Sequence, residues 1–174
     1  MCAPAGRESL LRPAAPGDAV ELAALREDRT LQHMLMANPE GDTASRAVSL
    51  ANTQNWITRR ERAGWFMVID AGWGAAGFVQ ISDIHQKNRY GWLGIALLPS
   101  VRGKGVGARA VEAAEQAAVA ELGLRKLLLQ VRADNVIALA LYGRAGWRRV
   151  GTMVAHYDDG TALHDAVIYE KALA

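Results

Sequence analysis

Hydrophobic positions recur along this chain with two spacings, and the strand-like spacing marks out a sheet. Runs rich in β-branched and aromatic residues, bounded by glycine or polar turns, predict strands. Three such runs follow one another closely and predict an antiparallel meander, while a later leucine run predicts a fully buried strand. Two further runs flank Asp159-Gly160, a dipeptide that favours a hairpin turn. The predicted strands are 9–13, 65–70, 75–83, 89–98, 126–131, 147–156 and 161–169.

Apolar residues at helical spacing predict four helices between these strands. Each begins near a residue whose side chain can cap a helix or at a glycine-rich turn, and Gly64, Gly123 and Gly146 follow three of them. The helices are expected from Asp18 toward Arg26, from Thr43 or Asp42 to about Arg62, over 106–122, and from Asp134 or Asn135 to Ala145.

The resulting element order predicts an α/β (α+β) fold with a mixed sheet of about seven strands. Helices on both faces would bury such a sheet. The length of 174 residues and a hydrophobic fraction of 51% suit one domain spanning residues 1–174. The order of elements does not by itself identify a function.

Composition excludes several classes of protein. The formal net charge is only +2, and like charges do not cluster, so a nucleic-acid groove is not expected. Cys2 is the single cysteine, which excludes a disulfide within the chain, and no metal site is predicted. There is no signal-peptide core and no apolar run of membrane-spanning length. A cytoplasmic protein that does not bind membranes is the simplest expectation.

The segment from Arg102 to Gly107 carries the most specific chemical signal. It reads Arg-Gly-Lys-Gly-Val-Gly and lies where a predicted strand gives way to a helix. Glycines there let backbone N–H groups point outward, and the helix dipole favours an anion at this end. The pattern predicts a loop that binds phosphate.

Spacing separates three phosphate-binding patterns. A nucleotide P-loop requires Gly-Lys-Ser/Thr, but Gly105 follows Lys104. A dinucleotide fingerprint is formally matched by Gly103, Gly105 and Ala108, yet the expected acidic residue falls on Glu121 inside the helix. The third pattern, Arg/Gln-x-x-Gly-x-Gly/Ala, is satisfied in full. A glycine-rich turn without a ligand remains the alternative.

This third pattern resembles the pyrophosphate loop of the GCN5-related N-acetyltransferases, and a second patch adds to the resemblance. Asn135 and Tyr142 stand seven residues apart on one predicted helix, which places them on the same face, and Gly146-Trp147 follows. Taken individually, Asn135 could simply cap a helix and Tyr142 could be a half-buried aromatic. The resemblance covers 74–157 through motifs and the first 65 residues through element order.

Several roles follow from the resemblance. It implies acetyl-CoA as co-substrate and direct attack by a primary amine in a ternary complex. Tyr142 is the candidate acid for the leaving thiolate, and a backbone N–H near the end of the fourth strand is the candidate oxyanion donor. The residues implied to bind the coenzyme are Ile95, Ala96, Leu97, Arg102, Gly103, Lys104, Gly105, Val106, Gly107, Ala108 and Asn135.

The general base is where the sequence departs from its relatives. A glutamate stands five residues before the motif asparagine in similar acetyltransferases, whereas this chain has Gln130, which cannot accept a proton near neutral pH. A substrate amine of lowered pKa, a water relay or another residue must serve instead. Asp83, His85 and Tyr90 flank the third and fourth strands on the side where acceptors enter similar enzymes. His85 is the candidate base among them, because the ordinary pKa of histidine lies near neutrality; the alternative is a solvated loop histidine.

The acceptor amine is expected to contact Trp56 and Gln130, although Trp56 could equally belong to the core. Two subgroups are similar in pattern: enzymes that acetylate ribosomal-protein N-termini or polyamines, and enzymes that acetylate nucleotide-linked aminosugars. A small-molecule amine of the second kind is the first expectation and a peptide amine the alternative. A non-catalytic acyl-CoA-binding module on the same fold also remains open, as does a homodimer formed through the edge of the final hairpin.

Overall fold

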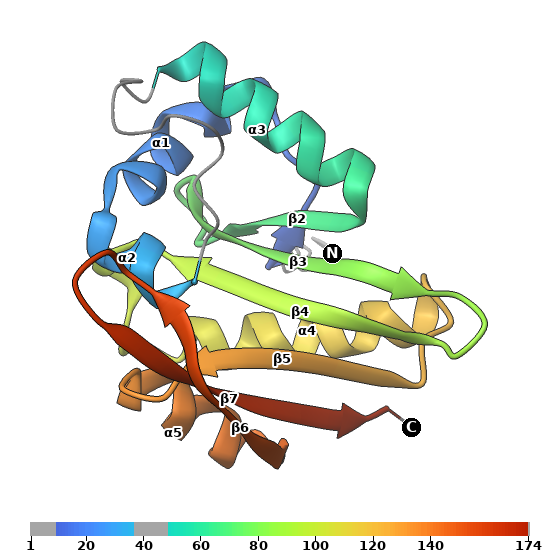
Figure 1. Ribbon diagram of the computed structural model, residues 1–174. Coiled ribbons are helices and arrows are strands. Elements are labelled where there is room, and N and C mark those ends of the chain that lie inside the picture. Colours follow the sequence, from blue (N-terminus) through green and yellow to red (C-terminus); the bar gives the residue numbers. More distant parts are fainter. Residues whose placement is uncertain (1–9, 37–48, 174) are drawn as a thin grey trace.

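The computed structural model describes residues 10–36 and 49–173 and contains one seven-stranded sheet in the order β1-β2-β3-β4-β5-β7-β6 (Figure 1). This confirms the predicted mixed sheet. No helix in these two segments is long and apolar enough to cross a membrane. The strands are β1 (Leu11–Arg12), β2 (Trp65–Asp70), β3 (Ala75–His85), β4 (Tyr90–Leu97), β5 (Lys126–Arg132), β6 (Arg148–Asp158) and β7 (Leu163–Ala172).

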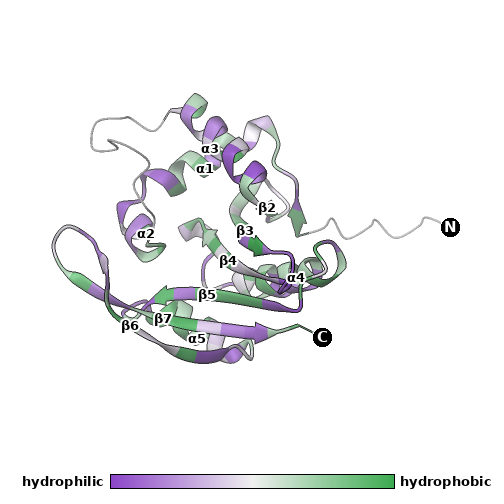
Figure 2. Ribbon diagram, turned by 45° about the vertical axis from the view of Figure 1, so that its right-hand side comes forward, coloured by the Kyte–Doolittle hydropathy of each residue, from purple (hydrophilic) through white to green (hydrophobic). Residues whose placement is uncertain are grey.

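Helices cover both faces of the sheet, as the sequence predicts (Figure 1). α1 (Ala19–Glu27) and α3 (Leu50–Ala63) pack on one face around a core that includes Leu22, Ile57 and Phe78. On the other face α4 (Val106–Ala120) and α5 (Val136–Arg144) enclose the larger core. Hydrophobic and hydrophilic residues alternate along these elements in Figure 2, which is the pattern expected where each element buries one side.

All strand pairs are antiparallel except β4 with β5. The parallel pairing covers only 90–92 of β4 against 126–128 of β5. Beyond Trp92 the two strands separate, although β4 stays paired with β3 as far as Leu97 and β5 stays paired with β7 as far as Arg132. The centre of the sheet therefore has an opening between two strands that are each secured on their outer side.

The N-terminal third differs most from the expected elements. A short helix, α2 (Arg29–Met34), was not predicted, and Ser49 rather than Thr43 or Asp42 caps α3 by accepting from the Asn52 amide. The two expected caps lie outside the described residues. The first strand covers only part of 9–13, and short 3₁₀ turns, η1 (Pro16–Asp18) and η2 (Pro99–Val101), precede α1 and the glycine loop.

Candidate active site

Backbone amides face the opening between β4 and β5. The Leu98 N–H donates to the Ala76 carbonyl at 2.8 Å, toward β3. Because hydrogen-bonding direction alternates along a strand, Gly94 and Ala96 also point toward β3, whereas Ile95 and Leu97 point into the opening. Among the expected donors, Ile95 and Leu97 therefore direct their amides into the opening, where no described residue accepts from them. Ala96 is a correction, since its amide belongs to the ladder and its side chain is buried in the core under α1 and α3.

A pocket of about 270 Å³ occupies this opening. Residues from α2 and β3 line it on the face covered by α1 and α3, residues from β4 line it on both faces, and residues from β5 and α5 line the remainder. The pocket thus connects the two faces of the sheet at the point where the strands diverge. Its lining residues are Met34, Leu35, Gln80, Ser82, Asp83, Trp92, Leu93, Gly94, Ile95, Gln130, Val131, Asn135, Ala138, Leu141 and Tyr142.

The glycine loop presents unpaired donors at the start of α4. Gly103 and Gly105 have φ values of +73° and +74°, a conformation that glycine adopts without strain. Within the described residues, no acceptor receives the amides of 103–108, and no side chain caps the helix. Arg102 and Lys104 are exposed beside them. Free N–H groups, two cations and a helix N-terminus form a fitting site for a pyrophosphate.

Two other positions of the loop, Val106 and Gly107, serve packing. Val106 is buried and Ala108 is exposed. A Cβ built on Gly107 would lie 3.2 Å from Leu97 Cδ1 and 3.7 Å from Leu141 Cδ2, so this glycine lets the first turn of α4 approach β4 and α5. Gly107 therefore differs from Gly105, beside which a Cβ would meet no atom within 4 Å.

α5 brings Asn135 and Tyr142 to the same pocket. Asn135 caps the helix by accepting from the Ala138 amide at 3.2 Å, and Tyr142 lies two turns further along. The Tyr142 side chain is only 4% exposed and packs edge-on against Trp147 at 5.5 Å between ring centroids. Burial raises the pKa of the Tyr142 phenol well above its ordinary value of about 10. The phenol consequently stays protonated throughout the neutral range.

One carboxylate lies at the pocket, that of Asp83. It is the single charged side chain among the described lining residues, and its Oδ2 accepts from the Ser82 hydroxyl at 3.0 Å. Asp83 has a φ of +48° at an irregularity in the β3–β4 pairing, which turns it out of the regular alternation of the strand. A carboxylate at this place can attract one ammonium group.

Comparison with known protein families decides the assignment. A model of the "Acetyltransferase (GNAT) family" matches residues 23–147. The chain belongs to this family. The match includes the pocket-lining strands, the glycine loop and α5, so the family resemblance expected from the sequence is confirmed.

The individual proteins that are similar to this chain have low sequence identity to it. An N-alpha-acetyltransferase of Saccharolobus solfataricus is 27% identical over 101 residues, which is 58% of this chain and 58% of the relative. The match thus spans little more than half of the length of that curated relative. Spermidine N-acetyltransferase of Vibrio cholerae, solved with CoA and spermine, has a TM-score of 0.81 at 21% identity, covering 94% of both chains. A ribosomal L7/L12 alpha-N-protein acetyltransferase solved with coenzyme A has a TM-score of 0.79 at 19% identity, covering 94% of this chain and 93% of that one. The solved structures establish the GNAT fold.

Two residues expected in the site lie elsewhere. Trp56 is 6% exposed and packs edge-on against Phe66 and Phe78 in the core under α1 and α3. His85 stands at the end of β3, outside the pocket lining; its Nδ1 accepts from the Asn88 amide at 3.1 Å and its ring stacks on Tyr90. His85 therefore lies away from the pocket in which an amine would react.

Other pocket residues were missed or only partly foreseen from the sequence. Gln130 does line the pocket, as expected, but Gln80 joins it without a recognisable motif. The alternation along β3 places Gln80 two residues after the core residue Phe78, on the same face. A sheet register would have located it beside Gly94, and the sequence alone does not supply that register. Across the described residues, no group of three or more His, Cys, Asp and Glu side chains could hold a metal ion.

Proposed function

We propose that the protein is an acetyl-CoA-dependent N-acetyltransferase acting on a primary amine in a ternary complex. The observation that carries this proposal is the continuity of the site: free amides of the 103–108 loop, free amides of β4 and a pocket through the sheet follow one another. A pyrophosphate at the loop and an acyl group at the Ile95 amide fit these donors.

Different residues of the pocket serve different steps of the acetyl transfer. Acetyl-CoA would supply a thioester whose C–S bond breaks as the amine nitrogen forms the new C–N bond. The Ile95 N–H is the oxyanion donor, and Tyr142 gives its proton to the departing sulfur. The amine releases one proton to water, and water returns one to Tyr142, so that protons balance. Burial raises the pKa of Tyr142, so the phenol carries its proton when the thioester binds, and the same low polarity makes a bare thiolate costly there.

The charges around the pocket favour an acceptor with a single ammonium group. A polyamine carries several cationic centres, but the described residues place one carboxylate, Asp83, at the pocket. A nucleotide-linked aminosugar carries a diphosphate, but the described lining residues include no lysine or arginine. Apolar walls from Met34, Leu35 and Trp92 suit an amino-acid side chain. We therefore infer a peptide-type α-amine as the acceptor, in place of an aminosugar.

A thiol-release screen tests this function. The purified protein and acetyl-CoA are mixed with peptide N-termini, polyamines and aminosugars, and free thiol is measured beside calorimetric binding of the coenzyme. Turnover on peptide amines is expected. Tight coenzyme binding with no thiol release on any amine would favour the alternative, a non-catalytic acyl-CoA-binding module, for which Gln130 in place of a glutamate is the specific argument.

A further inference from the structure

Gln80 is held at the pocket by a side chain from outside it. Arg60 on α3 donates from Nη1 to Gln80 Oε1. The Arg60 guanidinium lies over the Trp56 ring, 4.4 Å from its centroid, and 5.7 Å from that of Phe78. Trp56, buried in the core, thereby fixes Arg60, and Arg60 fixes Gln80.

This contact determines which end of the Gln80 carboxamide faces the pocket. A guanidinium has donors only, so it must bind the carboxamide oxygen and leave the NH₂ group on the other side. Gln80 is the cross-strand partner of Gly94, and a Cβ built on Gly94 would lie 3.2 Å from Gln80 Nε2. The NH₂ group therefore lies over Gly94, which lines the pocket. Among the described residues no acceptor receives its protons.

The position of this donor restricts what it can bind. Gly94 directly precedes Ile95, whose free amide marks the acyl position. An acceptor oxygen that reaches Gln80 must therefore lie within a few bonds of the attacking nitrogen. An α-aminoacyl group places a carbonyl oxygen at that separation, whereas a simple alkylamine or an alkyl polyamine has no oxygen there.

We propose that Gln80, oriented by Arg60, is a specificity-determining hydrogen-bond donor that selects amines bearing a neighbouring carbonyl oxygen. This inference rests on the proposed acetyltransferase function. A fixed donor discriminates well because a substrate amine without the carbonyl oxygen leaves the Gln80 NH₂ group desolvated and without a hydrogen-bond partner. Gln130, the other carboxamide at the pocket, is exposed and makes no side-chain hydrogen bond within the described residues, so it lacks this preorganisation.

The test compares two amines of similar shape, L-alaninamide and 3-methyl-2-butylamine, at equal concentrations of unprotonated amine. The wild-type protein is expected to favour the amide by about 10- to 100-fold in kcat/KM. Gln80→Glu keeps the contact with Arg60 but removes the donor, and Gln80→Met removes both. In each variant the ratio is expected to fall to within about threefold of unity, with coenzyme affinity unchanged.

Arg60→Met tests the orienting contact, with Arg62→Met on the exposed side of the same helix as its control. Arg60→Met should lower the ratio of the two kcat/KM values, chiefly by raising KM for the amide. Arg62→Met should leave this ratio unchanged. Equal rates on the two amines, or a wild-type ratio in both Gln80 variants, would overturn the inference while leaving the acetyltransferase function in place. Absence of thiol release on every amine would overturn that function as well, so the two failures are distinguishable.

Discussion

At the scale of single residues, Tyr142 combines burial with access to the pocket. Its ring belongs to the core formed with Trp147 and Tyr169, yet it lines the pocket. No charged group among the described residues contributes to its raised pKa, which comes from desolvation. A phenol in this setting is held as a proton donor and is protected from ionisation.

Replacing Tyr142 by phenylalanine should lower kcat by about 10²- to 10⁴-fold, because the departing sulfur would lose its proton donor. Coenzyme affinity and the melting temperature should change little, since the ring stays in place. Stopped-flow thiol release and calorimetry measure the two quantities, with Tyr90→Phe as a control away from the pocket. Full wild-type turnover would contradict the role of Tyr142 as acid.

The rate should depend on pH in one direction only over a wide range. Because the pKa of Tyr142 is raised above its ordinary value, the phenol remains protonated beyond pH 10. kcat/KM should therefore rise as the substrate amine loses its proton and show no alkaline decline below about pH 10. A decline centred between pH 8 and 9 would point to a different acid.

At the scale of elements, the glycine loop distinguishes two kinds of glycine. Gly105→Ala should cost about 1–2 kcal/mol of folding stability through its left-handed backbone and weaken coenzyme binding by disturbing the amides. Gly107→Ala adds contacts with Leu97 and Leu141, so its effect should come from displacement of the helix. Calorimetry with acetyl-CoA and thermal melts compare the variants. Unchanged affinity in Gly105→Ala would exclude this loop as the phosphate site.

Another element, the link between β1 and α1, depends on Asp18. This carboxylate binds Arg12 through two bonds of 2.7 Å and also accepts from the Ala15 amide. Arg12 holds the pKa of Asp18 below its ordinary value. The resulting stability is present above the unfolded-state pKa of about 3.9 and is lost as pH falls through the lower folded-state pKa.

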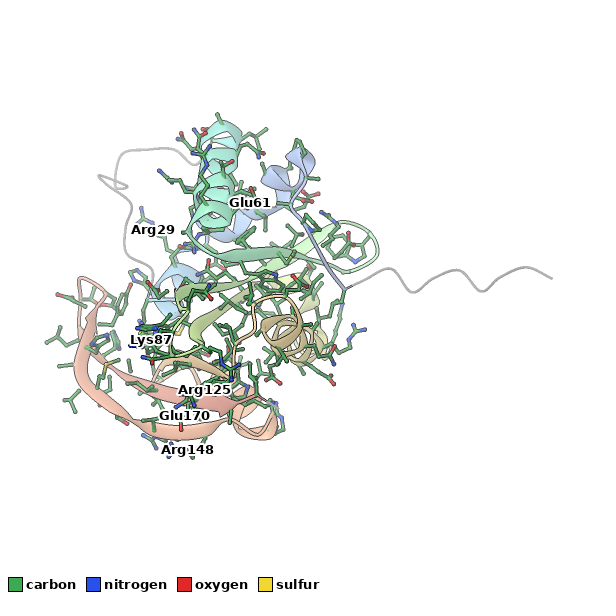
Figure 3. The ribbon with its side chains drawn as sticks, turned by 90° about the vertical axis from the view of Figure 1, so that its right-hand side faces the viewer. Arg29, Glu61, Lys87, Arg125, Arg148 and Glu170 are labelled. Carbon is green, nitrogen blue, oxygen red and sulfur yellow. The ribbon has the colours of Figure 1, made fainter. Side chains whose placement is uncertain are left out.

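Asp18→Asn should therefore lower the free energy of unfolding by about 1–3 kcal/mol at pH 7. The difference between wild type and variant should persist to about pH 5 and shrink below pH 4 as Asp18 becomes protonated. Urea unfolding at several pH values measures it, with Glu61→Gln as a control at an exposed position on α3 (Figure 3). A difference that grows on acidification would contradict the ion-pair account.

Sequence patterns predicted the elements that follow a regular period and missed those that do not. The meander, α4 and the final hairpin have clear alternation or helical spacing, and their bounds fall within a few residues of the expected ones. α2 has no buried residue, so its sequence lacks the helical spacing of apolar residues that would predict it. Trp56 and Gln80 show the same limit within the site, since a motif indicates residue types but not which strand positions face each other.

At the scale of the whole molecule, the two ends of the sheet have different characters. The pocket and glycine loop lie toward one end, and Figure 3 shows the opposite end, where Lys87, Arg125, Arg148 and Glu170 gather. Glu170 on β7 pairs there with Lys126 and with Arg148, and the Arg125 Nε donates to the Asn88 carbonyl at 3.0 Å. Charged contacts thus join the strands where β4 and β5 are still paired, and leave the other end open.

The short pairing of β4 with β5 has a consequence for hydrogen exchange. The Ile95 amide lies in the middle of a seven-stranded sheet but has no partner strand in the described structure, while the Ala96 amide beside it is bonded to β3. In deuterated solvent the Ile95 proton should exchange at least about tenfold faster than that of Ala96, and acetyl-CoA should slow Ile95 selectively. Residue-resolved NMR exchange measures both rates. Similar slow exchange at the two positions would mean that the opening between β4 and β5 is closed in solution.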